Sequence, residues 1–143
     1  MKLIRIEQQY VQTTFPLVEH LLEKAIRLNR GEFNLEDVHK WLLSGYMHLW
    51  IGVTEEDGIV LAATSEFCEY PRKKSLKMPL VAAERNTIGK WLDYCWRDNS
   101  EIIAFAKENN ADTIESSGRK GWNRVLANFG FKEYYTVLIK EIN

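Results

Sequence analysis

The sequence has few of the residues that define special classes of protein. Its 143 residues include two cysteines, Cys68 and Cys95, with only 3 prolines and 8 glycines. Two cysteines without a CxxC spacing cannot make a disulfide framework, so we expect free thiols in a reducing compartment. Little proline and glycine beside 45% hydrophobic residues excludes collagen-like, low-complexity and disordered chains. We therefore expect one folded domain over residues 1–143.

The sequence also lacks long apolar runs and an excess of either charge. No window approaches the roughly 18 uncharged apolar residues of a membrane span. Residues 7–9 (Glu-Gln-Gln) interrupt the N-terminal stretch where a signal peptide needs an apolar run. The 19 basic and 20 acidic residues give a net charge of −1, which provides no overall field to attract nucleic acid or anionic lipid. We expect a soluble cytoplasmic protein without a membrane or nucleic-acid partner.

The first half of the chain has the patterns of one strand, two helices and a hairpin. Apolar residues at steps of three and four predict a helix over residues 15–28, with Pro16 in its first turn. Asn34 is typical of a helix start and Gly45 of a helix end, which predicts a second helix between them. Apolar, β-prone runs predict strands, the last two of them joined by a turn, at residues 3–6, 48–54 and 59–67.

The second half alternates strands with helices. An apolar run at residues 76–83 predicts a strand, which Pro79 would place at a sheet edge or a bulge. A helix is predicted over residues 101–108, preceded by an irregular stretch or a short turn of helix. The remaining elements are a strand at 112–116, a short helix at 121–128 and a long final strand at 131–141. Hairpins followed by helix-linked strands indicate an α+β fold with a sheet of mixed direction.

One segment near the C-terminus carries a family resemblance. Gly121–Phe131, which ends in Gly130-Phe131, resembles the short helix and closing Gly-Phe of the GNAT acyltransferase superfamily. With Ser117–Trp122 and the ending Val137–Glu141, it is similar to small GNAT-like proteins encoded by tailed bacteriophages. The resemblance covers the whole chain in element order and the last third residue by residue. It implies a GNAT-like mixed, mostly antiparallel sheet flanked by about four helices, located in the host cytoplasm or the virion.

The resemblance also implies where acyl-coenzyme A would bind. In the family, a Q/R-x-x-G-x-G/A loop after the fourth strand opens a helix, and its backbone amides hold the pyrophosphate. Arg85 holds the first place here, but Ile88 and Lys90 stand at the two small-residue positions, and Gly89 is one residue out of register. We expect these side chains to crowd a phosphate against the backbone. If acetyl-CoA binds, the contacts are predicted at Arg85, Asn86, Thr87, Gly89 and Lys90.

The catalytic residues implied by the family are incomplete. The family has a tyrosine four residues before the Gly-Phe pair as general acid, and this chain has Leu126 there. Tyr134, or its neighbour Tyr135, is the available substitute, although either could serve only packing. The candidate general bases are Glu84, at the end of the fourth strand, and Glu66, on the third. Both carboxylates could equally be solvated surface groups.

Other chemistry has weaker signals. The three histidines lack the spacing of a metal site, so no metal is predicted. Arg119 and Lys120 could contact an anion or a partner, or simply form a polar turn. Arg119, Lys120 and Arg124 form one basic cluster in the sequence, and residues 72–74 with Lys77 form another. If the two clusters converge, they would form a local phosphate-binding patch.

These observations predict a GNAT-like protein with a degenerate acyl-CoA site. The expected role is a non-catalytic binding or structural component, with a protein partner or self-association, in a virion or its assembly. The alternative is an active acetyl-CoA-dependent N-acetyltransferase acting on a small-molecule or protein amine. Its pyrophosphate contacts would be Arg85 and Gly89 and its base Glu84. A nucleic-acid-binding module is supported only by the basic clusters.

Overall fold

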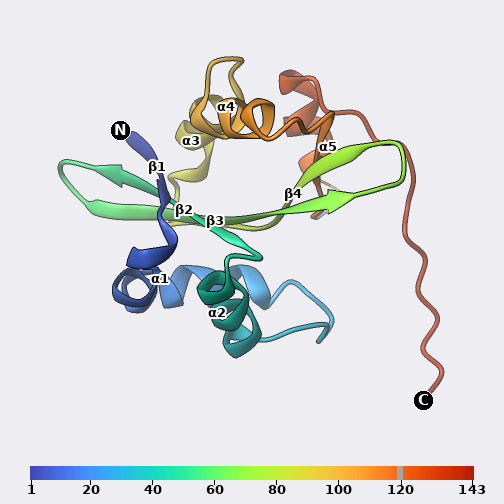
Figure 1. Ribbon diagram of the computed structural model, residues 1–143, viewed down its shortest axis with the longest axis horizontal. Helices are drawn as coiled ribbons and strands as arrows, with labels where there is room; N and C mark the ends of the chain where they lie inside the picture. The colour runs from blue at the N-terminus through green and yellow to red at the C-terminus, as the bar shows by residue number, and fades with distance from the viewer. Residues whose placement is uncertain (119–120) are drawn as a thin grey trace.

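A five-stranded sheet forms the middle layer of the molecule (Figure 1). The computed structural model describes residues 1–118 and 121–143. Neighbouring strands follow the chain order, and every pair is antiparallel except the parallel pair β4–β5. The α+β class with a mixed, mostly antiparallel sheet is therefore confirmed. The strands are β1 (Lys2–Ile6), β2 (His48–Thr54), β3 (Gly58–Glu69), β4 (Lys74–Ala83) and β5 (Thr113–Ser116).

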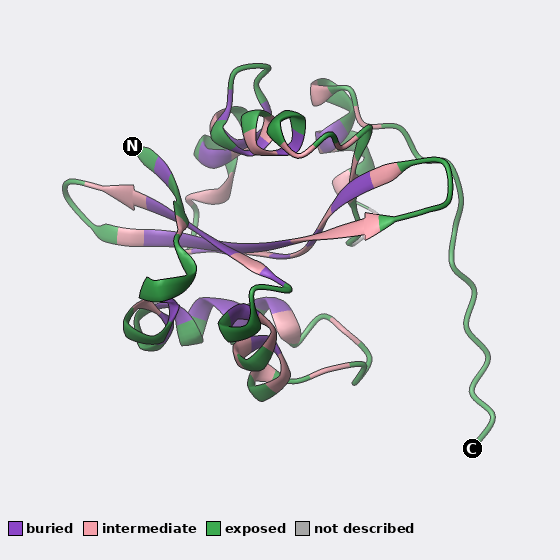
Figure 2. Ribbon diagram, in the orientation of Figure 1, coloured by how far each residue is buried: buried purple, intermediate pink, exposed green. Residues whose placement is uncertain are grey.

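Helices cover both faces of this sheet, and each face has its own core (Figure 1). Phe15, Val18 and Leu22 pack with Leu49 and Leu80 beneath α1 and α2. The core on the opposite face is built around Trp50, Leu61 and Trp91, and the central strands are accordingly the most buried part of the sheet (Figure 2). None of the described helices is both long and apolar enough to cross a membrane. The helices are α1 (Val11–Ile26), α2 (Leu35–Ser44), α3 (Ile88–Trp96), α4 (Glu101–Glu108) and α5 (Trp122–Leu126).

The first two helices follow their sequence signals with one correction. α2 has its predicted cap, since Asn34 Oδ1 accepts from the Asp37 amide at 2.9 Å and Gly45 ends the helix at a φ of 83°. α1 begins at Val11, directly after a 3₁₀ turn at Gln8–Tyr10, so the predicted start near residue 15 was wrong. Pro16 lies inside α1 and provides no amide for the preceding turn. The buried stripe that begins with Val11 compensates for that lost hydrogen bond.

The stretch before α4 is more regular than predicted. α3 spans Ile88–Trp96 and buries Trp91, Cys95 and Trp96, which occupy one side of a helix at steps of four and five. Ser100 then starts α4, because its Oγ accepts from the Ile103 amide at 3.1 Å. Of the two predicted alternatives, the helical one is closer, although α3 is longer than a single turn, and the polar residues between the two helices mark its end.

The predicted final strand at 131–141 was wrong. α5 continues as a 3₁₀ turn at Ala127–Phe129 and ends at Gly130, whose φ is 88°. No described residue after Gly130 lies in a strand or helix, and the chain runs away from the sheet (Figure 1). A strand needs a neighbour for its amides and carbonyls, and β5 is paired with β4 alone among the described residues. The C-terminal segment has strand-forming residues but pairs with no strand among the described residues.

Candidate functional site

The parallel strands β4 and β5 separate halfway along β4. Their pairing runs from Ser75 opposite Thr113 to Met78 opposite Ser116. The next residue of β4 is Pro79, which has no N–H to continue the ladder. Beyond it β4 pairs with β3 only, so its outer edge is open among the described residues. In an antiparallel strand, the N–H and C=O of one residue point to the same side, and successive residues alternate between the two sides. The N–H and C=O of Val81 and Ala83 therefore point to this open edge.

A β-bulge accompanies the separation. The register between β3 and β4 shifts so that Met78 and Pro79 together lie opposite the single residue Ser65. The predicted bulge at Pro79 is confirmed. The alternative edge position also holds locally, because β4 lies between β3 and β5 but its pairing with β5 ends at Met78.

Two side chains of α1 contact the end of β4. The Glu84 amide donates to the Val60 carbonyl at 2.8 Å, which continues the ladder one residue past β4. His20 Nε2 lies 2.8 Å from Glu84 Oε1, and Lys24 Nζ donates to the Ala83 carbonyl at 2.9 Å. His20 and Lys24 are four residues apart on α1, so they lie on one face of that helix. Sequence reasoning named Glu84 alone, since partners 64 and 59 residues away leave no local signal.

The segment that leads into α3 is tightly turned. The Thr87 hydroxyl donates to the Glu84 carbonyl at 2.6 Å, and Asn86 adopts a left-handed φ of 63°. The Lys90 amide donates to the Thr87 carbonyl at 3.1 Å. The amides of Ile88 and Gly89 are the other first-turn donors, and a helix leaves such groups without an internal acceptor. This end of α3 therefore presents two backbone donors to solvent, with the exposed Lys90 side chain nearby.

The predicted crowding by Ile88 does not occur. Ile88 packs against the core cluster between α3 and the sheet, so its side chain is directed inward. A Cβ added at Gly89 would meet nothing within 4 Å, which means that no neighbour requires a glycine there. The steric objection to a bound phosphate is thus limited to Lys90. The loop does not have the succession of small residues that would leave more of its backbone amides accessible to a phosphate.

Leu126, Tyr134 and Tyr135 are the residues that the resemblance relates to the general acid. Leu126 is buried in the core on the α3 face and is only 7% exposed. Tyr134 and Tyr135 are 82% and 79% exposed, in the segment that leaves the body of the protein (Figures 1 and 2). The structure therefore brings Glu84 together with the α3 loop and leaves Tyr134 apart from both.

Glu66, the other candidate base, has a different environment. It lies opposite Lys77 in the β3–β4 ladder. Its carboxylate hydrogen-bonds the Tyr46 hydroxyl, and this contact together with the negative charge raises the pKa of Tyr46. These contacts indicate a structural surface position for Glu66.

Sequence reasoning did not find a buried polar chain on the α4 face of the sheet. Trp50 Nε1 donates to Ser65 Oγ at 2.9 Å, and Ser65 Oγ lies 2.8 Å from His48 Nδ1. Burial, and secondarily the charge of Arg5, lowers the pKa of His48 to about 4. His48 is thus neutral at pH 7 and shares one hydrogen bond with the Ser65 hydroxyl. Ser65 is fully buried, so this pair orders the bulge region and is closed to substrate.

The sequence predicts two basic clusters and no metal site. Arg119 and Lys120 lie outside the described residues. Lys74 is engaged, 3.7 Å from a Glu69 carboxylate oxygen and 4.5 Å from the centre of the Phe67 ring. Within residues 1–118 and 121–143, no three His, Cys, Asp or Glu side chains group closely enough to hold a metal ion.

Known structures share this architecture. No protein-family model and no curated protein matches the sequence. Among solved structures, an aminoglycoside acetyltransferase from an uncultured soil metagenomic sample, in complex with sisomicin, has a TM-score of 0.66 at 18% identity, covering 99% of this chain and 96% of that chain. A predicted acetyltransferase with acetyl-CoA from Clostridium acetobutylicum has a TM-score of 0.67 at 16% identity, covering 99% and 95%. Glucosamine-6-phosphate N-acetyltransferase from Arabidopsis thaliana has a TM-score of 0.63 at 11% identity, covering 99% and 98%.

These neighbours define the class of fold. Each is an acetyltransferase matched over nearly its whole length, and the chain has the GNAT fold. Acetyl-CoA is part of one neighbouring structure. The residues of the present chain fit that cofactor in part, because the loop where the resemblance places the pyrophosphate offers the first-turn amides of Ile88 and Gly89. At the position that the resemblance assigns to the general acid, the chain has the buried Leu126, whose side chain has no proton to donate.

Proposed function

We propose that this protein keeps the GNAT fold without acyl transfer and acts as a binding or structural component through contacts with protein. The observation that carries the proposal is the buried Leu126 at the position of the general acid, with Tyr134 82% exposed elsewhere. A departing thiolate would find no positioned proton donor here.

The phosphate end of the site supports the same proposal. The Lys90 amide donates to the Thr87 carbonyl, so only the amides of Ile88 and Gly89 remain as first-turn donors. Two amides and a flexible lysine hold a diphosphate less firmly than a continuous nest of backbone donors. We therefore expect weak acetyl-CoA binding. The similarity of residues 117–131 to phage GNAT-like proteins supports a virion or assembly role as the finer form of this proposal.

A second candidate function rests on the contact between His20 and Glu84. The carboxylate lies at the end of β4 where the strands separate, and His20 Nε2 holds it at 2.8 Å. In an active N-acetyltransferase, Glu84 would accept the proton of an amine, directly or through water, and His20 would orient its carboxylate. Acetyl-CoA would supply the acetyl group. Both side chains are accessible, with 61% and 44% exposure, as a base that meets a substrate must be.

Product detection distinguishes the two functions. Purified protein is incubated with acetyl-CoA and a panel of primary amines, including an aminoglycoside, an amino sugar and lysine peptides, and acetylated products are measured by mass spectrometry. We expect no product above the enzyme-free rate. Product formation that falls about 100-fold or more in Glu84→Gln, and not in the matched control Glu66→Gln, would establish the acetyltransferase and refute our first proposal.

A further inference from the structure

The open edge of β4 carries unpaired backbone groups in a well-packed part of the sheet. β5 pairs with β4 only as far as Met78, and beyond it the N–H and C=O of Val81 and Ala83 point away from β3. Ala82 and Ala83 are each only 7% exposed. Within residues 1–118 and 121–143, no backbone group pairs with the amides of Val81 and Ala83 or with the Val81 carbonyl. Because buried backbone donors and acceptors are almost always paired in folded proteins, this edge is suited to an added occupant.

These unpaired groups have the spacing of a strand partner. Val81 and Ala83 are two residues apart, which separates their amides by about 7 Å along β4. An extended peptide repeats its own amides and carbonyls at the same interval, so one peptide can pair with both residues. Pro79 has no amide, and pairing at this edge therefore begins beyond it.

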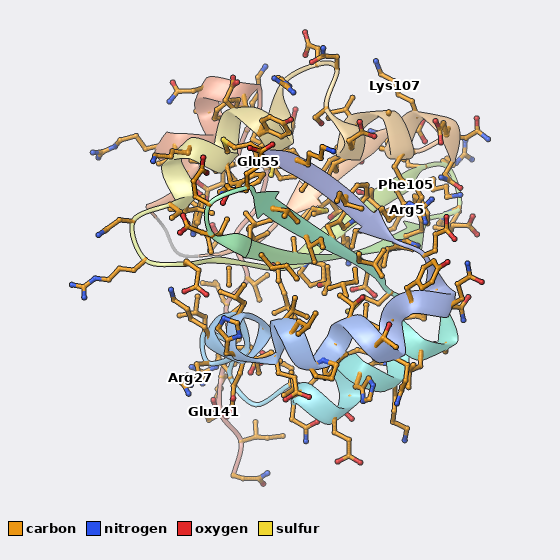
Figure 3. All side chains as sticks on the ribbon, turned by 90° about the vertical axis from the view of Figure 1, so that its left-hand side faces the viewer. Arg5, Arg27, Glu55, Phe105, Lys107 and Glu141 are labelled. Atoms are coloured by element: carbon orange, nitrogen blue, oxygen red, sulfur yellow. The ribbon has the colours of Figure 1, made fainter. Side chains whose placement is uncertain are left out.

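The far end of this edge is positively charged. The Lys24 ammonium donates to the Ala83 carbonyl at 2.9 Å, so it lies at the last open position of β4. Arg27, which follows α1, is exposed and points away from the sheet (Figure 3). Arg85 and Lys90 add two exposed cations in the segment directly after β4. An anionic group on the occupant would therefore be favoured at this end.

Glu84 is the acidic residue at the same end. Its Oε1 lies 2.8 Å from His20 Nε2, so this carboxylate is directed to a side chain of α1. The Thr87 amide and hydroxyl both donate to the Glu84 carbonyl, at 3.1 Å and 2.6 Å, which turns the chain tightly. The edge therefore ends at this turn, and a strand that stops here fits better than one that continues.

We propose that the open edge of β4 binds the C-terminal end of a partner protein as an added parallel strand, with the terminal carboxylate at Lys24. The inference rests on the proposed function, in which this protein acts through contacts with protein. Backbone hydrogen bonds to Val81 and Ala83 provide the affinity, and the Lys24 ammonium selects a chain that ends in a carboxylate. The orientation is parallel because β4 runs toward Lys24 and the peptide ends there.

The two sides of the edge determine which side chains fit. Alternate side chains of an added strand point to opposite faces of the sheet. On one face, Val81 and Ile88 pack against the core next to α3. On the other face, His20 and Lys24 approach from α1. The occupant should therefore have apolar residues toward α3 that alternate with polar residues toward α1.

Hydrogen exchange locates the occupant. In the free protein, the amides of Val81 and Ala83 should exchange fast, and the amide of Ala82, which is directed to β3, should exchange slowly. Two pools of synthetic hexapeptides, with valine at alternate positions and varied polar residues between, differ only in ending in a carboxylate or an amide. The carboxylate pool should slow exchange at Val81 and Ala83 and leave Ala82 unchanged.

Removal of one charge tests the role of Lys24. Lys24→Met should weaken the binding of carboxylate peptides about 10-fold, because a charge-assisted hydrogen bond is lost, and should leave amidated peptides unaffected. The matched control Arg27→Met removes a charge of the same sign three residues further along the chain and should bind like the wild type. Both side chains are exposed, so both variants should fold.

Four results would overturn the proposal. They are unchanged exchange at Val81 and Ala83, equal effects of the two pools, equal affinities of the two variants, and slower exchange with acetyl-CoA or at higher protein concentration but not with peptides. The acetylation assay separates this site from the proposed function. Acetylated product would refute the proposed function itself, whereas the absence of both product and peptide binding would refute only the peptide site.

Discussion

The Phe131 ring packs against the Trp96 ring with an interplanar angle of 76° and a centroid separation of 5.0 Å. Trp96 is the last residue of α3, and Phe131 follows the turn at Gly130. The contact therefore joins the end of α3 to the chain that follows α5. Phe131 is the closing aromatic of the Gly-Phe pair on which the family resemblance rested. Its role in the structure is packing.

Replacing Phe131 with alanine should destabilise the protein. The ring is partly buried against Trp96, so the expected loss is about 2–3 kcal/mol, below the range for a fully buried phenylalanine. Urea unfolding measures it. Phe131→Leu, which keeps most of the apolar contact, should lose about half as much. Equal stability of the alanine variant would show that the contact does not form in solution.

Gly52 and Gly89 should respond oppositely to alanine. A Cβ at Gly52 would lie 2.8 Å from Cη2 of Trp91 and 2.9 Å from Cβ of Leu61, both in the packed core. We expect Gly52→Ala to cost about 1–3 kcal/mol. Gly89→Ala meets nothing within 4 Å and lies in α3, so it should be neutral or stabilise by up to about 1 kcal/mol. Thermal melts of both variants test the prediction, and a destabilised Gly89→Ala would contradict it.

His48 makes stability depend on pH. Burial lowers its folded-state pKa to about 4, against 6.5 unfolded, so between these values the unfolded chain binds more protons. Its contribution to stability is complete above about pH 6.5 and is lost as the pH falls towards 4. Because His48 is only partly buried, we expect an effect of about 1–2 kcal/mol. Urea unfolding of the wild type and of His48→Gln between pH 4 and 7.5 should show a flatter profile for the variant, and parallel profiles would exclude His48 as the cause.

The two cysteines should differ in reactivity. Burial raises the pKa of Cys95 to about 12, and its side chain lies in the core on the α3 face. Cys68 is partly exposed on β3. A disulfide reagent at pH 8 should modify one thiol of the folded protein, and the second only on unfolding. Cys68→Ser should show no fast reaction. Rapid modification of both thiols would contradict the packing around Cys95.

The order of elements up to β5 could be read from the sequence because it depends on local patterns. The cap at Asn34 and the glycine at position 45 bracket α2 as predicted. The segment 131–141 shows the limit of such patterns. Strand-favouring residues at 134–139 indicate what the segment can form, but whether it pairs with an edge such as that of β5 is not determined by local pattern, and it pairs with no strand among the described residues.

The candidate site could be predicted only in part for the same reason. Glu84 and the α3 loop follow one another in the chain, so their proximity was predictable. The contacts of His20 and Lys24 with the end of β4 arise from packing of α1 on the sheet. The inward direction of Ile88 depends on the rotation of α3, which the sequence predicted only as an irregular stretch or a short turn of helix.

Titration calorimetry with acetyl-CoA tests most directly whether the cofactor site of the GNAT fold has been lost. With only two first-turn amides at the start of α3 for the diphosphate, we predict a Kd no tighter than about 1 mM, or about −4 kcal/mol of binding free energy. Gly89→Ala should give the same result. Binding of the wild-type protein in the low micromolar range would contradict the loss of the cofactor site.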